Sequence, residues 1–139
     1  MISEKQVIKV LMPFPNDVSG LALIKHYYIC NKNNSNNKLL FKCQTQKANL
    51  IGKIGIKKFR EQYFPIQAST IVPFEHQTVV DKKQLFSLLN TTISRSYLTN
   101  RDIPDSIYNN IVKEILTDGS PKTIEINKVD FIRLNPECS

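Results

Sequence analysis

The first half of the chain consists of short runs of apolar and β-branched residues separated by turn residues. Residues 7–12 (VIKVLM) form the first run, which predicts a strand. The strand is expected to stop at Pro13 and Pro15, because proline has no amide donor for a sheet ladder. Residues 16–20 (NDVSG) have the composition of a turn and are expected to end the loop at Gly20.

A long hairpin is predicted next. Residues 24–31 and 38–45 are strand-like and flank a polar stretch whose asparagines tolerate turn conformations. Side chains alternate along a strand, so Lys25 and Tyr27 share one face of the first run. His26 and Tyr28 share the other face. Each face therefore offers one polar group that can reach a site.

The region after the hairpin has weaker patterns. Residues 70–74 and 78–81 read as two short strands, or as one bent strand interrupted by Pro73. Residues 82–89 are interpreted as a loop or a short turn of helix. We therefore expect only short strands between the hairpin and the C-terminal part of the chain.

The C-terminal part is predicted to contain one helix and one strand. The helix opens at residues 103–107, where Asp102 or Pro104 suits its first turn, and its isoleucines repeat every fourth position at 107, 111 and 115. Gly119 and Pro121 end it. Residues 123–126 and 129–134 then alternate well enough for a last strand.

The order of these elements predicts a single domain over residues 1–139. Several short strands followed by a helix indicate a mainly β protein of the α+β class, with strongly curved antiparallel strands. Such a sheet has to close into a small barrel or cover its edges. No internal repeat or linker interrupts the pattern.

Composition agrees with a folded domain. With 139 residues, 41% hydrophobic and 22% charged, the chain has enough apolar residues for one core. No run approaches the roughly 20 apolar residues that span a bilayer, and the N-terminus lacks a basic region followed by an apolar one. We therefore expect a cytosolic protein in which Cys30, Cys43 and Cys138 stay reduced.

The positive charge is concentrated in one segment. Of the 19 basic residues, seven lie between positions 38 and 60, which contain no acidic residue, so the rest of the chain has 12 basic and 12 acidic residues. A clustered excess of this kind attracts polyanions, and neutralisation of phosphates would make binding salt-sensitive. The same pattern also fits a solvated basic loop.

Three stretches, in order, resemble the MazF/PemK family of toxins from type II toxin–antitoxin systems. Residues 10–20 (VLMPFPNDVSG) resemble the first family strand and its loop, and residues 41–47 (FKCQTQK) resemble the third strand, which ends in threonine or serine. Residues 78–85 (TVVDKKQL) resemble the family stretch R-T-I-D-K-x-x-L and are followed by residues 103–107, where the family has its last helix. Each motif alone is unspecific, whereas their order and spacing carry the resemblance.

The resemblance covers residues 7–116 and implies a fold and a function. The family fold is a small SH3-like barrel, also found in CcdB, and its members usually act as homodimers. Family members cut single-stranded mRNA without a metal or cofactor, because the 2′-hydroxyl attacks the adjacent phosphate and leaves a cyclic phosphate and a 5′-hydroxyl. A small acidic antitoxin blocks the same groove. Residues 120–139 look like an addition whose strand guards an edge or meets a partner.

Family active-site residues carry over onto three positions. The threonine falls on Thr45, and the arginine falls on Lys25, beside His26 where the family has proline. Lysine supplies a point charge instead of a planar fork that matches phosphate oxygens. Histidine exchanges protons near neutral pH. The expected roles are charge stabilisation for Lys25, proton transfer for His26 and phosphate positioning for Thr45.

Alternative interpretations remain open for these residues. Lys25 and Thr45 also suit an ordinary strand surface, and His26 suits a packed position or, with Cys30 and Cys43, a metal site. Aromatic residues of the hairpin suit either base stacking or the core, namely Tyr27, Tyr28 and Phe41. The basic residues expected to contact the RNA backbone are Lys42, Lys47, Lys53, Lys57, Lys58 and Arg60.

Two other functions fit the same sequence. The first is a barrel that has lost the family arginine and binds nucleic acid or a protein without cutting. The second is inhibition of a topoisomerase, as CcdB relatives of this barrel do. The substitution of the family arginine by Lys25 keeps the first alternative open.

Overall fold

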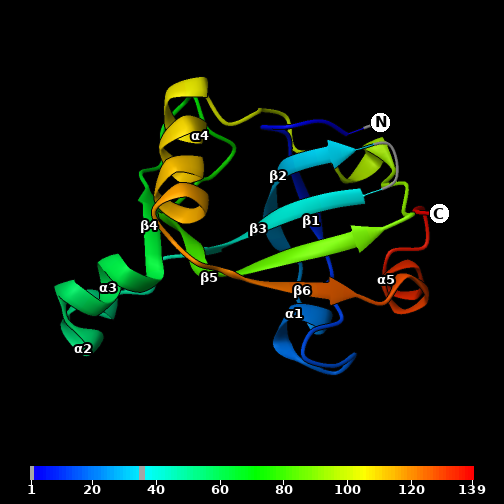
Figure 1. Cartoon of the computed structure of the whole chain (residues 1–139), viewed down its shortest axis with the longest axis horizontal. Helices are drawn as coiled ribbons and strands as arrows, with labels where there is room; N and C mark the ends of the chain where they lie inside the picture. Colours follow the sequence, from blue (N-terminus) through cyan, green and yellow to red (C-terminus); the bar gives the residue numbers. More distant parts are fainter. Residues whose placement is uncertain (1, 35–36) are drawn as a thin grey trace.

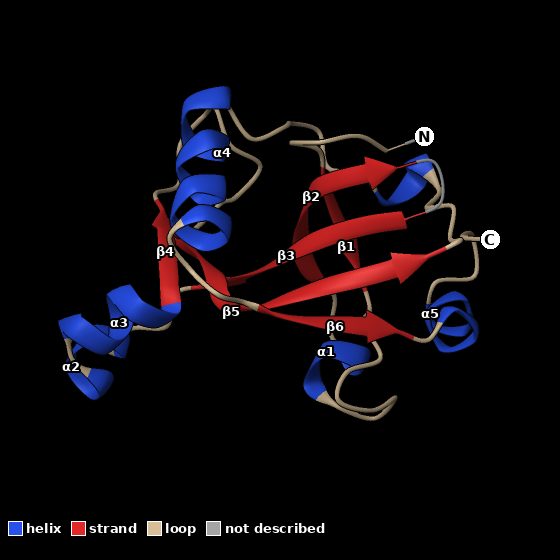
Figure 2. Cartoon of the chain, in the orientation of Figure 1, coloured by secondary structure: helices blue, strands red, loops and turns tan. Residues whose placement is uncertain are grey.

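A computed structural model describes residues 2–34 and 37–139, and over these residues the chain forms a six-stranded sheet surrounded by helices (Figure 1, Figure 2). The strands are β1 Val7–Val10, β2 His26–Asn34, β3 Asn37–Thr45, β4 Tyr63–Ile66, β5 Thr78–Leu89 and β6 Lys122–Ile126. The helices are α1 Gly20–Leu23, α2 Leu50–Ile54, α3 Ile56–Gln62, α4 Asp105–Val112 and α5 Lys128–Leu134, with single turns η1 Arg95–Tyr97 and η2 Lys113–Thr117. The chain is therefore of the α+β class, as predicted.

The sheet is open, which corrects the predicted closed barrel. Its strands follow the order β1, β2, β3, β5, β4 with antiparallel neighbours, and β6 pairs with β5 in parallel. Among the described residues, no strand pairs with the outer edge of β1, which forms only an isolated antiparallel bridge between Ile8 and Leu98. The loop that contains Leu98 thus takes the place of the strand that would close a barrel.

The hairpin prediction is confirmed. β2 and β3 pair antiparallel, and both strands run further into the asparagine-rich stretch than predicted, while Ser35 and Asn36 of the predicted tip lie outside the described residues. The predicted alternation also holds, because Tyr28 and Tyr27 belong to hydrophobic clusters on opposite faces of the sheet. Residues 28–31 of β2 are thus buried on both sides, which explains the apolar residues in this part of the strand.

Two hydrophobic clusters hold helices against the two faces. The first contains Phe86 and Tyr28 and is covered by Phe131 of α5. The second contains Phe41 and is covered by Ile111 of α4 and by residues of the turn that follows it. In Figure 1, α4 and α5 accordingly lie toward opposite ends of the sheet.

Residues 70–89 differ from the prediction. Residues 82–89 continue β5 and form neither a loop nor a helical turn, and residues 70–74 are irregular. The strand that pairs with the first part of β5 is instead β4, Tyr63–Ile66, which was not predicted. β5 bends sharply, since Phe41 pairs with Leu85 while Cys43 pairs with Val80. On the edge of β5 away from β3, β4 pairs with residues 78–81 and β6 pairs with residues 84–88, on either side of this bulge.

The basic segment after β3 is helical, which corrects its interpretation as a loop. α2 and α3 project from the body of the protein as an arm (Figure 1). Gly55 separates the two helices with a φ of 87°, a left-handed backbone that favours glycine. Most of the predicted RNA-contacting side chains are therefore carried on this arm.

The C-terminal region is partly as predicted. α4 and β6 are confirmed, and β6 covers the edge of β5 in the way expected of an edge-guarding strand. Residues 129–134, however, are in α5 instead of a strand. The Asn127 side chain caps this helix by accepting from the Asp130 amide at 3.0 Å. No helix in the described ranges is both long and apolar enough to cross a lipid bilayer.

The three thiols are buried, and their pKa values make the fold sensitive to alkali. Burial is the main cause that raises the pKa of Cys30 from 9.0 to about 11, and burial also raises the pKa of Cys43 and of Cys138. Raised thiol pKa values stabilise the folded state below the ordinary pKa, and this stabilisation is lost as pH rises through the folded value. For Cys30 this stabilisation is lost between pH 9 and about pH 11.

We expect the free energy of unfolding to fall between pH 8 and pH 10. Each thiol that stays protonated in the folded state lowers the free energy of unfolding by about 1.4 kcal/mol per pH unit above its ordinary pKa. Burial lowers the pKa of Lys38, which acts in the opposite direction and offsets part of the loss. Urea unfolding at the two pH values measures the change, and Cys43→Val should make it smaller. An equal pH dependence in Cys43→Val and wild type would contradict this account.

Candidate functional site

Three strand ends meet on one side of the sheet. β2 begins at His26, β3 ends at Thr45 and β5 begins at Thr78. Tyr27 pairs with Cys43 and Thr45 pairs with Thr78, so the ends lie side by side in the order β2, β3, β5. Polar residues that flank these strands are therefore gathered in one place.

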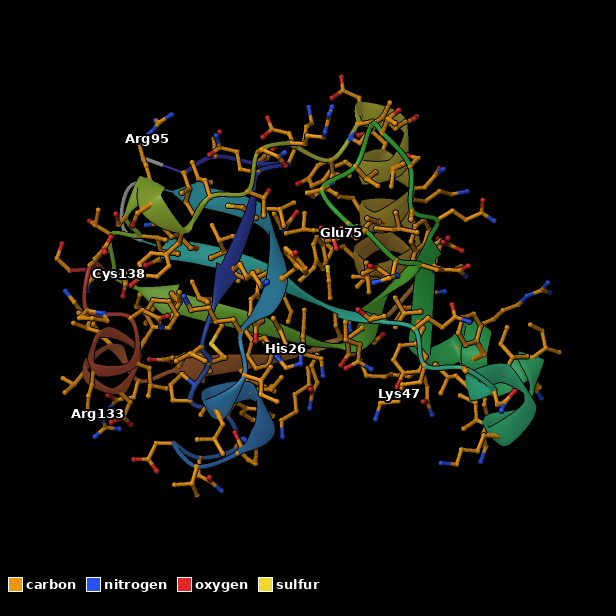
Figure 3. All side chains as sticks on the ribbon, turned by 180° about the vertical axis from the view of Figure 1, so that it is seen from behind. His26, Lys47, Glu75, Arg95, Arg133 and Cys138 are labelled. Atoms are coloured by element: carbon orange, nitrogen blue, oxygen red, sulfur yellow. The ribbon has the colours of Figure 1, made fainter. Side chains whose placement is uncertain are left out.

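A cavity of about 530 Å³, here called the strand-end cavity, opens at this junction. The three predicted catalytic residues Lys25, His26 and Thr45 all line it. Other polar residues of its wall are Lys9, Gln44, Lys47, Glu75, His76 and Thr78. Figure 3 shows His26, Lys47 and Glu75 projecting from three different segments on this side of the molecule. The fold thus brings together residues that lie more than fifty positions apart.

A second cavity of about 890 Å³, here called the outer cavity, adjoins the first. Lys9, Lys25, Tyr27, Phe74 and Glu75 line both cavities, so we treat the two together as the groove. The outer cavity also contains Tyr97 and Arg101, together with hydroxyl and amide side chains of residues 69–70 and 96–100. The groove therefore extends well beyond the predicted catalytic residues.

Two lysines of the groove lie over aromatic rings. The ammonium nitrogen of Lys9 is 5.1 Å from the centre of the Tyr27 ring, and that of Lys25 is 5.8 Å from the centre of the Tyr97 ring. Attraction between cation and ring holds each lysine near the groove wall. Tyr27 is itself packed edge-on against Phe74, with ring centres 5.2 Å apart. Positive charge and aromatic surface are thus interleaved.

The ring of His26 has a defined orientation. Its Nδ1 lies 2.8 Å from the carbonyl oxygen of Ile24. A carbonyl oxygen only accepts hydrogen bonds, so Nδ1 must be the protonated donor. In the neutral ring the lone pair is then on Nε2, which can accept a proton. His26 is therefore arranged to act as a general base.

The groove carries an excess of positive charge. Lys9, Lys25, Lys47 and Arg101 line it against a single carboxylate, Glu75, among its described lining residues. No ion pair joins Glu75 to these cations within the described part of the chain. Concentrated cations in a concave surface attract phosphate groups. The groove is thus suited to a polyanion.

The groove has to be interpreted from its own residues. No protein-family model, curated protein or solved structure matches the chain. The resemblance to MazF/PemK toxins therefore rests on the three sequence stretches named above. The roles of Lys25, His26 and Thr45 rest on the chemistry of the cavity that they line.

The metal-site alternative does not fit the cysteine positions. Cys30 belongs to the hydrophobic cluster under α5, whereas Cys43 belongs to the cluster under α4, on the other face. Among the described residues, no group of three or more His, Cys, Asp and Glu side chains is arranged to hold a metal ion. Cys43 lines the strand-end cavity, but its raised pKa keeps it a thiol and makes it a poor nucleophile.

The predicted RNA-contacting residues divide into three groups. Lys47 lines the strand-end cavity. Lys42 is largely buried and forms an ion pair of 3.3 Å with Asp81, so its charge is already compensated. The remaining residues lie on the arm, namely Lys53 in α2 and Lys57, Lys58 and Arg60 in α3. The basic segment therefore contributes one residue to the groove and the rest to its surroundings.

The hairpin aromatics also divide. Tyr28 and Phe41 are fully buried and cannot stack on a base, which settles them as core residues. Tyr27 lines both cavities and keeps that possibility. Sequence reasoning missed five lining residues from three separate segments, namely Lys9, Phe74 and His76, and Tyr97 and Arg101. Of these, only Lys9 could have been singled out from the sequence, because it is the single polar residue within the first predicted strand.

Proposed function

We propose that the protein is a metal-independent endoribonuclease that cuts single-stranded RNA by attack of the 2′-hydroxyl on the adjacent phosphate. The observation that carries the proposal is the convergence of Lys25, His26 and Thr45 on one cavity. These residues supply a cation, a proton acceptor and a hydroxyl donor. This set meets the needs of the reaction.

Each residue has a distinct part in the proposed reaction. Nε2 of His26 takes the proton of the 2′-hydroxyl, because its Nδ1 is held by the Ile24 carbonyl. Lys25 stabilises the negative charge that grows on the phosphorane oxygens. The hydroxyl of Thr45 donates to a phosphate oxygen and fixes the position of the scissile group. The products are a cyclic phosphate and a 5′-hydroxyl end.

Single-stranded RNA is the substrate that suits the rest of the groove. Unpaired bases can stack on exposed aromatic faces, and Tyr27 and Tyr97 line the outer cavity. Lys9 lies over the Tyr27 ring and Arg101 lines the same cavity, so both would neutralise the flanking phosphates. Lys53, Lys57 and Lys58 on the arm extend the basic surface beyond the groove.

The proposal includes the partners that the MazF/PemK resemblance implies. A small acidic antitoxin would occupy the same groove, where its carboxylates would meet Lys9, Lys25 and Lys47. A homodimer and a cytosolic location belong to the same proposal. Measurement of molecular mass at several protein concentrations would test the dimer.

Cleavage of a long RNA in EDTA tests the function. The wild-type protein is expected to give discrete fragments with 5′-hydroxyl ends and cyclic phosphates. Thr45→Val removes the hydroxyl but keeps the side-chain shape, so cleavage should slow by about 10- to 100-fold, the range of one lost transition-state hydrogen bond. Mapping of the fragment ends and single-turnover rates measure both effects.

A matched control uses a second threonine. Thr123 is exposed on β6 and lines neither cavity, so Thr123→Val should cut RNA at the wild-type rate. Binding of RNA by the wild-type protein with no cut at any site would reject the nuclease. That result would support the alternative of a nucleic-acid-binding module.

A further inference from the structure

The two histidines of the chain lie in one cavity. The sequence contains only His26 and His76, which are fifty positions apart, and both line the strand-end cavity. His26 has a role in the proposed reaction, whereas His76 has none so far. Two proton-transfer groups in one site are what 2′-hydroxyl attack requires, because one proton leaves the nucleophile and another must reach the leaving oxygen.

The strand order puts the two histidines on either side of Thr45. His26 is on β2, Thr45 ends β3, and His76 lies two residues before Thr78 at the start of β5. Since β3 lies between β2 and β5, the histidines flank the phosphate that Thr45 would position. Across the sheet the two histidine backbones are two strand spacings apart, roughly 10 Å. Along the sheet they are offset by roughly another 10 Å, because the register puts His26 level with Gln44 and His76 level with Lys47. Both side chains line the cavity of about 530 Å³ at this junction, which has room for a phosphate.

The backbone around His76 is fixed against the end of β3. The Gln46 amide donates to the Gln77 carbonyl at 2.8 Å, and the Gln77 side-chain amide donates to the Gln46 side chain at 2.8 Å. The Thr78 hydroxyl donates to the His76 carbonyl at 3.0 Å. These bonds tie the residues next to His76 to the strand that carries Thr45. The His76 ring itself is exposed and available to a substrate.

We propose that His76 is the general acid that protonates the leaving 5′-oxygen. The proposal rests on the proposed nuclease function. The 2′-oxygen forms a bond to phosphorus while His26 takes its proton. The bond between phosphorus and the 5′-oxygen breaks, and that oxygen takes the proton from His76. The nucleophile and leaving group are in line, so an acid and a base on opposite sides of the phosphate match the reaction.

Other groups of the cavity suit this role less well. Lys25 and Lys47 are needed as cations, and a lysine that gave up its proton would remove charge from the phosphorane. Glu75 is exposed, and an ionised carboxylate is an acceptor only. Histidine is the side chain that both holds and releases a proton near neutral pH. His76 is therefore the best proton donor among the lining residues.

A leaving group that needs no proton tests the assignment. The substrate is a short RNA in which sulfur replaces the bridging 5′-oxygen at the cut site, because a thiolate leaves without protonation. On ordinary RNA, His76→Ala should slow the single-turnover rate by about 10²- to 10⁴-fold. On the sulfur substrate, His76→Ala should cut within about 10-fold of wild type. His26→Ala should stay slow on both substrates, because the nucleophile still needs a base.

Each outcome decides a separate claim. No cleavage of ordinary RNA by the wild type would overturn the nuclease and the role of His76 together. Wild-type cleavage by His76→Ala, or a slow variant without rescue by sulfur, would overturn only the role of His76. If the sulfur substrate restored cleavage by His26→Ala instead of His76→Ala, the assignment of His26 as base and His76 as acid would be overturned. Binding of a 2′-deoxy RNA analogue controls for misfolding. His76→Ala and the conservative variant His76→Asn should both bind it with an affinity within about 3-fold of wild type.

Discussion

Replacement of His26 by alanine is expected to slow RNA cleavage by about 10²- to 10⁴-fold, the range of a lost general base. The variant loses Nε2, the proton acceptor whose orientation depends on the bond from Nδ1 to the Ile24 carbonyl. Lys25 and Thr45 should keep their places, because the described hydrogen bond of the His26 ring runs to the Ile24 carbonyl and to neither of these side chains. The effect should therefore appear in the single-turnover rate, and RNA affinity should change little.

Two further variants separate chemistry from position. In His26→Asn the side-chain amide can still donate to the Ile24 carbonyl, but it offers no base, so the rate should stay as low as in His26→Ala. Added imidazole should partly restore His26→Ala, because it can enter the vacated space and accept the proton. Thermal melting should be unchanged, since His26 is partly exposed. A wild-type rate in His26→Ala would reject His26 as the base.

The parts of the fold that the sequence predicted are those with strong local patterns. Apolar alternation marks β2 and β3, and isoleucine spacing marks α4. The start of β5 was predicted as a strand, but its continuation over residues 82–89 was missed because the Lys82, Lys83 and Gln84 run looks like a loop. The charge of Lys82 is compensated only in the folded state. Lys82 lies 3.8 Å from Glu114 and donates to the Arg60 carbonyl at 2.7 Å.

Tertiary contacts also explain the error at the C-terminus. Residues 129–134 alternate like a strand, but they form α5, which Asn127 caps and Phe131 anchors in the core. The buried Asn135 that follows exchanges hydrogen bonds with the backbone of Leu11, its Oδ1 accepting at 3.0 Å and its Nδ2 donating at 2.8 Å. The partner is more than a hundred residues away. No local pattern could have revealed it.

The groove was predictable only where residues lie close in sequence to a recognisable stretch. Lys25, His26 and Thr45 were found because the hairpin resembles a family pattern. Arg101 and His76 were not, because they reach the groove from loops that have no periodicity of their own. Sequence reasoning also assigned binding by charge density, which favoured the arm, whereas the groove collects isolated cations from several segments.

The largest effect on stability is expected at Phe86. Its ring is fully buried at the centre of the first hydrophobic cluster, edge-on to Phe14 at 5.3 Å and to Tyr28 at 6.0 Å. Truncation to alanine removes these contacts and leaves a cavity that the surrounding strands cannot collapse into. We expect Phe86→Ala to lower the free energy of unfolding by about 3–5 kcal/mol. Urea unfolding at pH 7 measures the change.

The same variant tests the assignment of β5, because Phe86 lies in the stretch that the sequence suggested was a loop. In a loop the ring would be exposed and its loss would cost under about 0.5 kcal/mol. Phe86→Leu keeps most of the volume and should cost about 1.5 kcal/mol or less. Val129→Ala, at a side chain that is 73% exposed on α5, is the control that should leave stability unchanged. A small loss in Phe86→Ala would therefore contradict both the core position of this ring and the strand that carries it, and with it the β5 end on which the groove is built.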